Sequence, residues 1–306
     1  MNDIFDLIIV GMGPASVTAH VYALRYNMKV LAIGGIPGGL MMETHKICNW
    51  PGEIAITGAE LSQKMMAQLQ AMDANIVMEM VSQISGQIND FTVTTVSGKS
   101  FQSKRVLIAT GTKHRHLGID NEERLTGRGV AYCATCDAMF YKGRITAVTG
   151  GGNSAMTSAL YLADLCPRVY LIYRGQALKG EEALKDEISK KSNITVIAQN
   201  NITAIKGEDK VTGLVLEHEF ERQSELTVDG LFVEIGTLPL SDLAKDLGVE
   251  LDEYGFVKVG QDQSTSLAGV YAAGDLTNAS NNFRQIATAV GEGATAANAI
   301  YSALKK

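Results

Sequence analysis

The chain opens with a nearly unbroken apolar run, Ile-Phe-Asp-Leu-Ile-Ile-Val, at residues 4–10. A strand that is buried on both faces of a parallel sheet has this pattern, because neither face meets water. A glycine-rich turn follows at once, then a helix-like stretch to about Tyr26 and a second apolar run at 29–33. The pattern therefore predicts a β-α-β unit at the start of the chain.

The same order of elements recurs later in the chain. Residues 145–149 are strand-like, the turn 150–155 reads Gly-Gly-Gly-Asn-Ser-Ala, and a helix over 155–165 and a strand over 169–173 follow. The glycines that open the two turns, Gly11 and Gly150, stand 139 residues apart. Two such units predict an α/β fold with two nucleotide-binding, Rossmann-like domains of three layers.

The first turn has residues suited to a dinucleotide. It reads Gly-Met-Gly-Pro-Ala-Ser, a G-x-G-x-x-G pattern in which Ser16 replaces the third glycine. Gly11 permits the tight turn, Gly13 lets a pyrophosphate approach the backbone, and the helix N-terminus offers oriented N–H groups. The acid usual near the end of the second strand is missing at Gly34. A tight β-α turn without a ligand is the alternative interpretation.

The second turn indicates which nucleotide it takes. An acid at the end of the second strand favours the free ribose of NAD, whereas arginine favours the 2′-phosphate of NADP. Here the strand end reads Tyr-Arg-Gly-Gln from Tyr173, with Lys179 further on. Because no acid is present and two cations are near, the pattern favours NADPH over NADH. Arg174 as a plain surface charge is the alternative.

Further segments are predicted as helices and strands. An amphipathic helix covers 58–72, and its apolar residues Leu61, Met65, Met66 and Leu69 are expected in the core. Alternation predicts strands at 77–81, 91–96 and 106–109. The strand-like runs 194–197, 211–218 and 231–235 predict a β-meander, and a small-residue helix is expected over 284–304.

Two segments have residues suited to a flavin. The loop 34–52 ends in Asn-Trp-Pro-Gly from Asn49, which suits a segment lying over a flat ring system. A short strand ends in Gly274-Asp275, where a carboxylate is placed to accept hydrogen bonds from a ribityl chain. A simple surface loop and a helix N-cap are the respective alternatives.

Composition limits the class of protein. The 306 residues suggest two domains, and 46% apolar with 20% charged residues is ordinary for a globular protein. A net charge of −6 without a dense Lys/Arg run gives little support to nucleic-acid or acidic-membrane binding. The first residues have no basic segment, and the apolar run at 7–10 is too short to span a bilayer. The cytoplasm is therefore the expected location.

A cysteine pair, Cys-Ala-Thr-Cys-Asp at 133–137, lies between the two nucleotide-binding patterns. It suits either a redox dithiol or half of a zinc site, but Cys48 and Cys166 are isolated and no other ligands stand at zinc spacing. If a helix turn starts at Asp137, the thiols lie near its positive end, which lowers a thiol pKa. Asp137 is then a proton carrier or only a helix-terminal charge. We expect a dithiol and no metal.

With these residues in place, the chain resembles the low-molecular-weight (bacterial/archaeal-type) thioredoxin reductase family along essentially its whole length. The motifs that carry the resemblance are Gly-Met-Gly-Pro-Ala at 11–15, Asn-Trp-Pro-Gly at 49–52, Ala-Thr-Gly at 109–111, Cys-Ala-Thr-Cys-Asp at 133–137, the turn 150–155, Gly-Asp at 274–275 and Phe-Arg-Gln at 283–285.

The resemblance implies a discontinuous FAD-binding domain, 1–113 and 246–306, with a pyridine-nucleotide domain, 114–245, inserted into it. Cys136 would lie against the flavin, Cys133 would attack the partner and Asp137 would be the acid/base. The FAD residues so implied are Gly11, Gly13, Pro14, Ala15, Gly39, Asn49, Thr110, Gly111, Gly274, Asp275, Arg284, Gln285 and Ile286. Those for NADP are Gly152, Asn153, Ser154, Arg174 and Lys179.

The resemblance further implies a homodimer that reduces thioredoxin or a thioredoxin-like protein. In the family, the dithiol and the nicotinamide compete for one flavin face, so the inserted domain rotates about hinges, expected here at 111–113 and 237–239.

The chain departs from the family in three segments. The run His-Arg-Arg-x-x-x-Arg becomes Tyr-Arg-Gly-Gln-Ala-Leu-Lys at 173–179, a helical glutamate pair becomes Thr157-Ser158, and a loop glutamine becomes Leu40. NADPH is the expected donor, with NADH and reduced ferredoxin as alternatives. A flavin-binding redox sensor without turnover is the alternative from another class.

Overall fold

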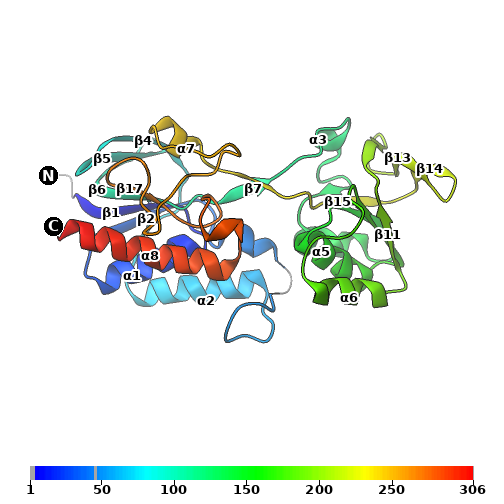
Figure 1. Cartoon of the computed structure of the whole chain (residues 1–306), viewed down its shortest axis with the longest axis horizontal. Helices are drawn as coiled ribbons and strands as arrows, with labels where there is room; N and C mark the ends of the chain where they lie inside the picture. Colours follow the sequence, from blue (N-terminus) through cyan, green and yellow to red (C-terminus); the bar gives the residue numbers. More distant parts are fainter. Residues whose placement is uncertain (1–3, 45–46, 306) are drawn as a thin grey trace. The chain divides into compact units, whose positions relative to one another are not determined.

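The computed structural model describes residues 4–44 and 47–305 (Figure 1). Contacts divide the chain into two compact units. Among the described residues, unit 1 consists of 4–42, 47–113 and 238–305, and unit 2 consists of 43–44 and 114–237. In the described part of the chain, no helix combines the length and the apolar character needed to cross a membrane.

Unit 1 is built on a sheet in the order β3-β2-β1-β6-β5-β4, with β17 paired to β6. The apolar run at the start of the chain forms its centre, because β1 lies parallel between β2 and β6. The strands are β1 (Phe5–Val10), β2 (Val30–Ile33), β3 (Asn75–Val77), β4 (Val81–Gln87), β5 (Asp90–Thr95), β6 (Ser100–Ile108) and β17 (Val270–Ala272).

Helices α1 (Pro14–Arg25), α2 (Gly58–Ala71) and α8 (Ile286–Leu304) lie on one side of this sheet (Figure 1). Leu7 and Ile9 of β1 pack in the core on the side of α1 and α8, whereas Ile8 and Val10 pack in the core of the other side. That second core includes Ala244 of α7 (Asp242–Asp246). Burial on both faces explains why the run is apolar at nearly every position.

Unit 2 is also built on a parallel sheet, and it has three layers. Its parallel sheet has the order β11-β10-β9-β15-β8, with α5 and α6 on one face and a three-stranded antiparallel sheet, β12-β13-β14, packed on the other. The parallel strands are β8 (Val130–Ala131), β9 (Ile145–Thr149), β10 (Arg168–Tyr173), β11 (Ile194–Ala198) and β15 (Gly230–Val233). The others are α5 (Asn153–Ala163), α6 (Glu182–Lys190), β12 (Ile202–Lys206), β13 (Gly213–Phe220) and β14 (Gln223–Leu226).

The remaining helices and strands are short. They are η1 (Gly39–Glu43), β7 (Thr112–His114), α3 (Glu122–Leu125), α4 (Ala134–Asp137), η2 (Ala138–Tyr141), β16 (Thr237–Pro239) and η3 (Ser280–Asn282).

The predicted α/β fold with two nucleotide-binding units is confirmed, but three predicted elements are wrong. Residues 78–80 are not a strand, because the chain leaves the sheet after β3 and re-enters it as β4. The runs 194–197 and 231–235 do not belong to a β-meander, since β11 and β15 are strands of the parallel sheet. The helix turn near the cysteines begins at Ala134 and not at Asp137.

The chain passes between the units within a two-stranded sheet formed by β7 and β16. The crossings fall at 113/114 and 237/238. The second differs from the predicted boundary at 245/246, because Leu243 and Ala244 of α7 pack in the core of unit 1.

Candidate active site

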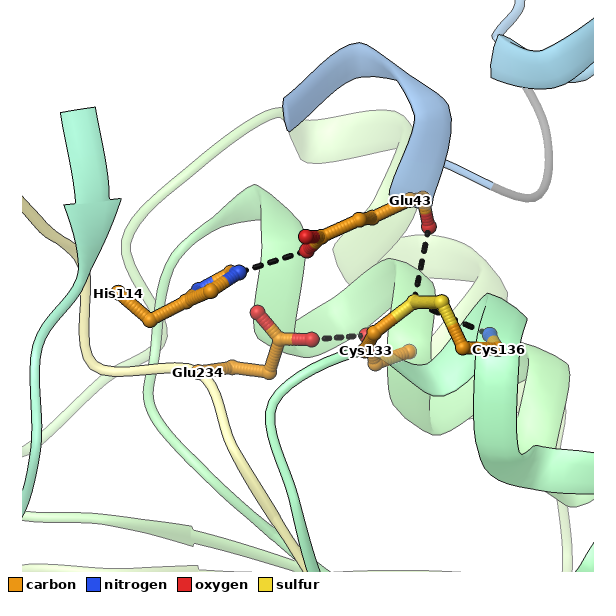
Figure 2. The surroundings of a disulfide bond; sticks show 6 residues. Glu43, His114, Cys133, Cys136 and Glu234 are labelled. Carbon is orange, nitrogen blue, oxygen red and sulfur yellow. Dashed lines mark hydrogen bonds and ion pairs between the residues drawn. A yellow bond between two sulfur atoms is a disulfide. The ribbon is translucent and has the colours of Figure 1, made fainter. Parts of the chain in front are cut away.

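Cys133 and Cys136 are joined in a disulfide at the start of α4 (Figure 2). Cys133 is the N-cap residue of this turn, and the backbone N–H of Cys136 donates to Cys133 Sγ at 3.0 Å. Cys133 is half-buried and Cys136 is exposed. An N–H group aimed at sulfur stabilises negative charge there, so after reduction the thiolate form of Cys133 is favoured.

Acidic and basic side chains surround the disulfide in unit 2. The carbonyl oxygen of Glu43 lies 3.9 Å from Cys133 Sγ, and the Glu43 carboxylate pairs with Nε2 of His114 at 2.6 Å. This hydrogen bond raises the pKa of His114 above its usual value. Figure 2 shows His114 and Glu43 directed toward each other beside the disulfide.

Two further carboxyl groups in unit 2 have raised pKa values. Burial, and then the nearby charge of Glu43, raise the pKa of Asp137. Burial raises the pKa of Glu234 to about 6, although Ser158 Oγ donates a hydrogen bond to it at 2.7 Å. A carboxyl group with a raised pKa stays protonated closer to neutral pH, as a proton carrier must.

Sequence reasoning missed Glu43, His114 and Glu234. Glu43 and His114 stand far apart in the chain, and no spacing pattern connects them. Of these three residues, only Glu234 could have been found from a local sequence pattern, because it is a carboxylate that directly follows the apolar run of β15.

Several segments that carry predicted FAD residues meet at the N-terminus of α1 in unit 1. Gly11 has φ +123°, and a Cβ on it would lie 2.2 Å from the carbonyl oxygen of Ala109, so only glycine fits there. A Cβ on Gly39 would lie 3.6 Å from Gly13, and one on Gly274 would lie 3.1 Å from Cβ of Ala15. Three segments distant in the sequence therefore meet at this turn.

The turn is open where a phosphate would approach. Gly13 is the N-cap residue of α1 and Pro14 occupies its first turn. No heavy atom of the described residues outside its chain neighbours lies within 4 Å of a Cβ built on Gly13. Because the N-terminus of a helix offers unpaired backbone N–H groups, an open turn at this position is suited to a pyrophosphate.

Other predicted FAD residues contact one another or the chain nearby. Asn49 Nδ2 donates to Gln285 Oε1 at 2.9 Å, and Ile286 packs against the apolar cluster around Met41 and Ile47. Thr110 Oγ1 donates to the carbonyl of Leu240 at 2.7 Å, and the carbonyl of Gly111 accepts from Leu240 N at 2.9 Å.

Asp275 follows β17 and is partly buried. Burial raises its pKa to about 6, whereas the charge of Arg284 acts in the opposite direction. Arg284 Nε also donates to the Asp275 carbonyl at 3.2 Å, and its guanidinium lies over the ring of Phe256. No helix begins next to Asp275, so the N-cap interpretation does not apply.

Glu292 of α8 is a buried residue that sequence reasoning missed. Its carboxylate accepts from Gly274 N at 2.7 Å, from Ser280 Oγ at 2.6 Å and from Thr277 Oγ1 at 3.3 Å. These bonds fix the turn that carries Asp275. The residues of unit 1 thus fit FAD, because an open phosphate turn and a partly buried acceptor carboxyl group for a polyol, that of Asp275, are both present.

The predicted NADP residues surround the second turn. A Cβ on Gly150, which has φ +141°, would lie 2.1 Å from the Glu234 carbonyl oxygen. Gly152 is the N-cap residue of α5, and Ser154 is exposed in its first turn. Arg174 and Lys179 are exposed, and neither side chain has an ion pair within the described ranges.

Asn153, another predicted NADP residue, is the first residue of α5 and bonds to the loop that follows β10. Its Oδ1 accepts from Glu181 N at 2.9 Å, and its Nδ2 donates to Glu181 Oε1 at 3.0 Å. Its polar atoms are therefore engaged by the chain itself.

Two nucleotide-binding turns and a redox disulfide in one chain define a flavoprotein-type disulfide oxidoreductase. The sequence matches the family model for pyridine nucleotide-disulphide oxidoreductase over residues 5–293. It is 36% identical to a thioredoxin reductase of Listeria innocua, covering 96% of this chain and 92% of that protein, and 40% identical to one of Mycolicibacterium smegmatis, covering 96% and 94%. The chain belongs to the low-molecular-weight thioredoxin reductase family.

Solved structures agree with this assignment. The thioredoxin reductase of T. acidophilum is 36% identical with a TM-score of 0.92, covering 99% of both chains. A ferredoxin-flavin thioredoxin reductase of Clostridium acetobutylicum is 30% identical with a TM-score of 0.54, covering 100% of both chains. The chain is thus a disulfide oxidoreductase whose redox pair is Cys133–Cys136.

Proposed function

We propose that this chain is an FAD-dependent reductase that reduces thioredoxin or a thioredoxin-like protein through Cys133 and Cys136. The observation that carries the proposal is the disulfide at 133–136 in a chain with two nucleotide-binding turns. The similar curated proteins are thioredoxin reductases, which supports the choice of acceptor. We further propose the cytoplasm as its location and a homodimer as its assembly, both by analogy with the family.

The chemistry follows from the pair and its surroundings. Two electrons and two protons convert the disulfide into two thiols, and a bound flavin in its reduced form would supply the electrons. The Cys133 thiolate attacks the acceptor disulfide, forms a mixed disulfide and releases one acceptor thiol. Cys136 then attacks Cys133, which re-forms the pair and releases the second acceptor thiol. Asp137, with its raised pKa, takes up and returns a proton in these steps.

Residues of unit 1 hold the flavin in this proposal. The turn at Gly11 and Gly13 would receive the pyrophosphate at the N-terminus of α1. Asp275 would accept hydrogen bonds from the ribityl hydroxyl groups, and Glu292 bonds to Gly274 beside it. Asn49 would help to hold the FAD, and Gln285, to which it bonds, would lie by the ring system.

NADPH is the proposed electron donor, because Arg174 and Lys179 are exposed cations next to the second turn. Reduced ferredoxin is a second candidate. It is favoured by the loss of the arginine run at 173–179 and by the similarity to the ferredoxin-flavin enzyme of Clostridium acetobutylicum.

A test that needs no natural donor separates the disulfide chemistry from the donor. The flavin-loaded protein is photoreduced without oxygen and mixed in the dark with an oxidised thioredoxin, whose new thiols are counted by alkylation and mass spectrometry. We expect thiols with the natural protein and none with Cys133→Ser, although this variant keeps its FAD. Cys166→Ser is the matched control, because Cys166 lies outside the pair and serine retains its hydrogen bond to the Tyr141 carbonyl.

Equal thiol formation by Cys133→Ser and the natural protein would remove the pair from the mechanism. Reduction of the pair without any thioredoxin thiols would instead leave a redox sensor that does not turn over this acceptor.

A further inference from the structure

The ring of Tyr173 lies between two glycines at the second nucleotide-binding turn. A Cβ on Gly151 would lie 2.3 Å from Cδ2 of this ring, and a Cβ on Gly175 would lie 2.5 Å from Cε1. Opposite edges of the ring therefore touch the two backbones. Any side chain at either glycine would overlap it.

The two glycines are explained by the ring and not by backbone conformation. Neither Gly151 nor Gly175 is among the described glycines with positive φ, whereas Gly150 is. A residue with a side chain would adopt their backbone angles without the strain that positive φ brings. The absence of side chains at these positions thus makes room for Tyr173.

The register of the sheet sets the ring beside the turn. Ile172 is opposite Thr149, and Gly150 N donates to the Ile172 carbonyl at 2.9 Å, so Tyr173 leaves β10 next to the first glycine. In this fold the residue at the end of the second strand reads the ribose of the bound nucleotide. Here that position is occupied by a phenol ring that lies against the turn.

The loop after β10 holds the ring in place. Lys179 N donates to the carbonyl of Gly151 at 2.6 Å, and Gln199 N donates to the carbonyl of Gly175 at 3.0 Å. Glu181 bonds twice to the Asn153 side chain. The loop 174–181 is therefore attached to the turn at two points, and the ring lies between loop and turn.

We propose that Tyr173 fills the ribose end of the second nucleotide-binding turn, so that a pyridine nucleotide binds only when the ring and its loop move away. This inference rests on the proposed use of that turn by NADPH. Because the ring and the ribose cannot share one space, the apparent affinity for the nucleotide falls by the fraction of molecules in which the turn is open. Tyr173 thereby determines how well this chain uses NADPH.

The test is equilibrium binding of NADP⁺ to the flavin-loaded protein, measured by calorimetry. We expect Tyr173→Ser to bind NADP⁺ about tenfold or more tightly than the natural protein, because the ribose end is then open in all molecules. Tyr173→Phe keeps the ring and should bind like the natural protein. Tyr254→Ser is the control for loss of a tyrosine, since Tyr254 is an exposed residue of unit 1.

A second variant covers the case in which Tyr173→Ser does not fold. Glu181→Ala removes the side-chain bond between Glu181 and Asn153 and keeps the backbone one, so it loosens the loop without touching the ring and should also tighten NADP⁺ binding. Affinity in Tyr173→Ser that equals or falls below that of the natural protein would overturn the inference, and so would Tyr173→Phe matching Tyr173→Ser. The photoreduction test uses no nucleotide, so its result is independent of this one.

Discussion

At the scale of single residues, burial sets the charge state of groups outside the redox pair. His20 of α1 is fully buried, and neither of its ring nitrogens has a hydrogen-bond partner among the described residues. Burial therefore lowers the pKa of His20 from 6.5 to about 4. The folded chain keeps this imidazole neutral under conditions in which the unfolded chain protonates it.

This difference between the pKa of His20 in the folded and the unfolded chain predicts that the protein loses stability in acid. As pH falls from about 6.5 toward about 4, the unfolded state gains a proton on His20 that the folded state does not bind. The loss attributable to His20 approaches about 3 kcal/mol at the acid end, since each pKa unit corresponds to about 1.4 kcal/mol. His20→Leu should lose less stability between pH 7.5 and pH 5 than the natural protein.

Urea unfolding followed through the fluorescence of Trp50, the one tryptophan, measures this effect. His218→Leu is the control, because His218 is an exposed histidine. An equal loss of stability on acidification in His20→Leu and the natural protein would contradict the assignment.

At the scale of elements, the close contact between α1 and α8 positions the FAD turn. A Cβ on Gly293 of α8 would lie 2.2 Å from the carbonyl oxygen of Ala15, which belongs to the first turn of α1. On the same helix, Gly291 has no heavy atom of the described residues within 4 Å of such a Cβ, its own helix backbone apart. A side chain at position 293 would therefore overlap α1, whereas position 291 has space for one.

Gly293→Val should push α8 away from α1, destabilise the protein by about 1–3 kcal/mol and weaken FAD retention, because overpacking forces backbone shifts. Gly291→Ala should stabilise by up to about 1 kcal/mol, since glycine inside a helix is unfavourable relative to alanine. Thermal unfolding and the FAD-to-protein absorbance ratio measure both. Retention of FAD and stability by Gly293→Val would show that the contact is not required.

The sequence predicted those elements whose patterns are local. The two β-α-β units, the small-residue helix α8 and the cysteine pair each occupy a short segment with its own signal. The role of Glu292 could not be predicted from the sequence, because tertiary packing brings its partners Gly274 and Ser280 to it. The same reason applies to Glu43 and His114, and to the ring of Tyr173, whose partners Gly151 and Gly175 resemble ordinary turn glycines in sequence.

At the scale of the whole molecule, the chain has one nucleotide-binding turn in each unit and one redox disulfide. The second unit carries the cysteines between its first strand β8 and the strand β9 that leads into its turn. The hinges proposed at 111–113 and 237–239 coincide with the segments where the chain crosses between the units. The electron path proposed for this chain therefore ends at a pair that belongs to the inserted unit.

The most direct test of that path is the number of electrons taken up per bound flavin in an anaerobic reductive titration. The flavin and the disulfide each accept two electrons, so the natural protein should take up twice as many as Cys133→Ser. Equal uptake by the two proteins would contradict the assignment of Cys133–Cys136 as the redox partner of the flavin.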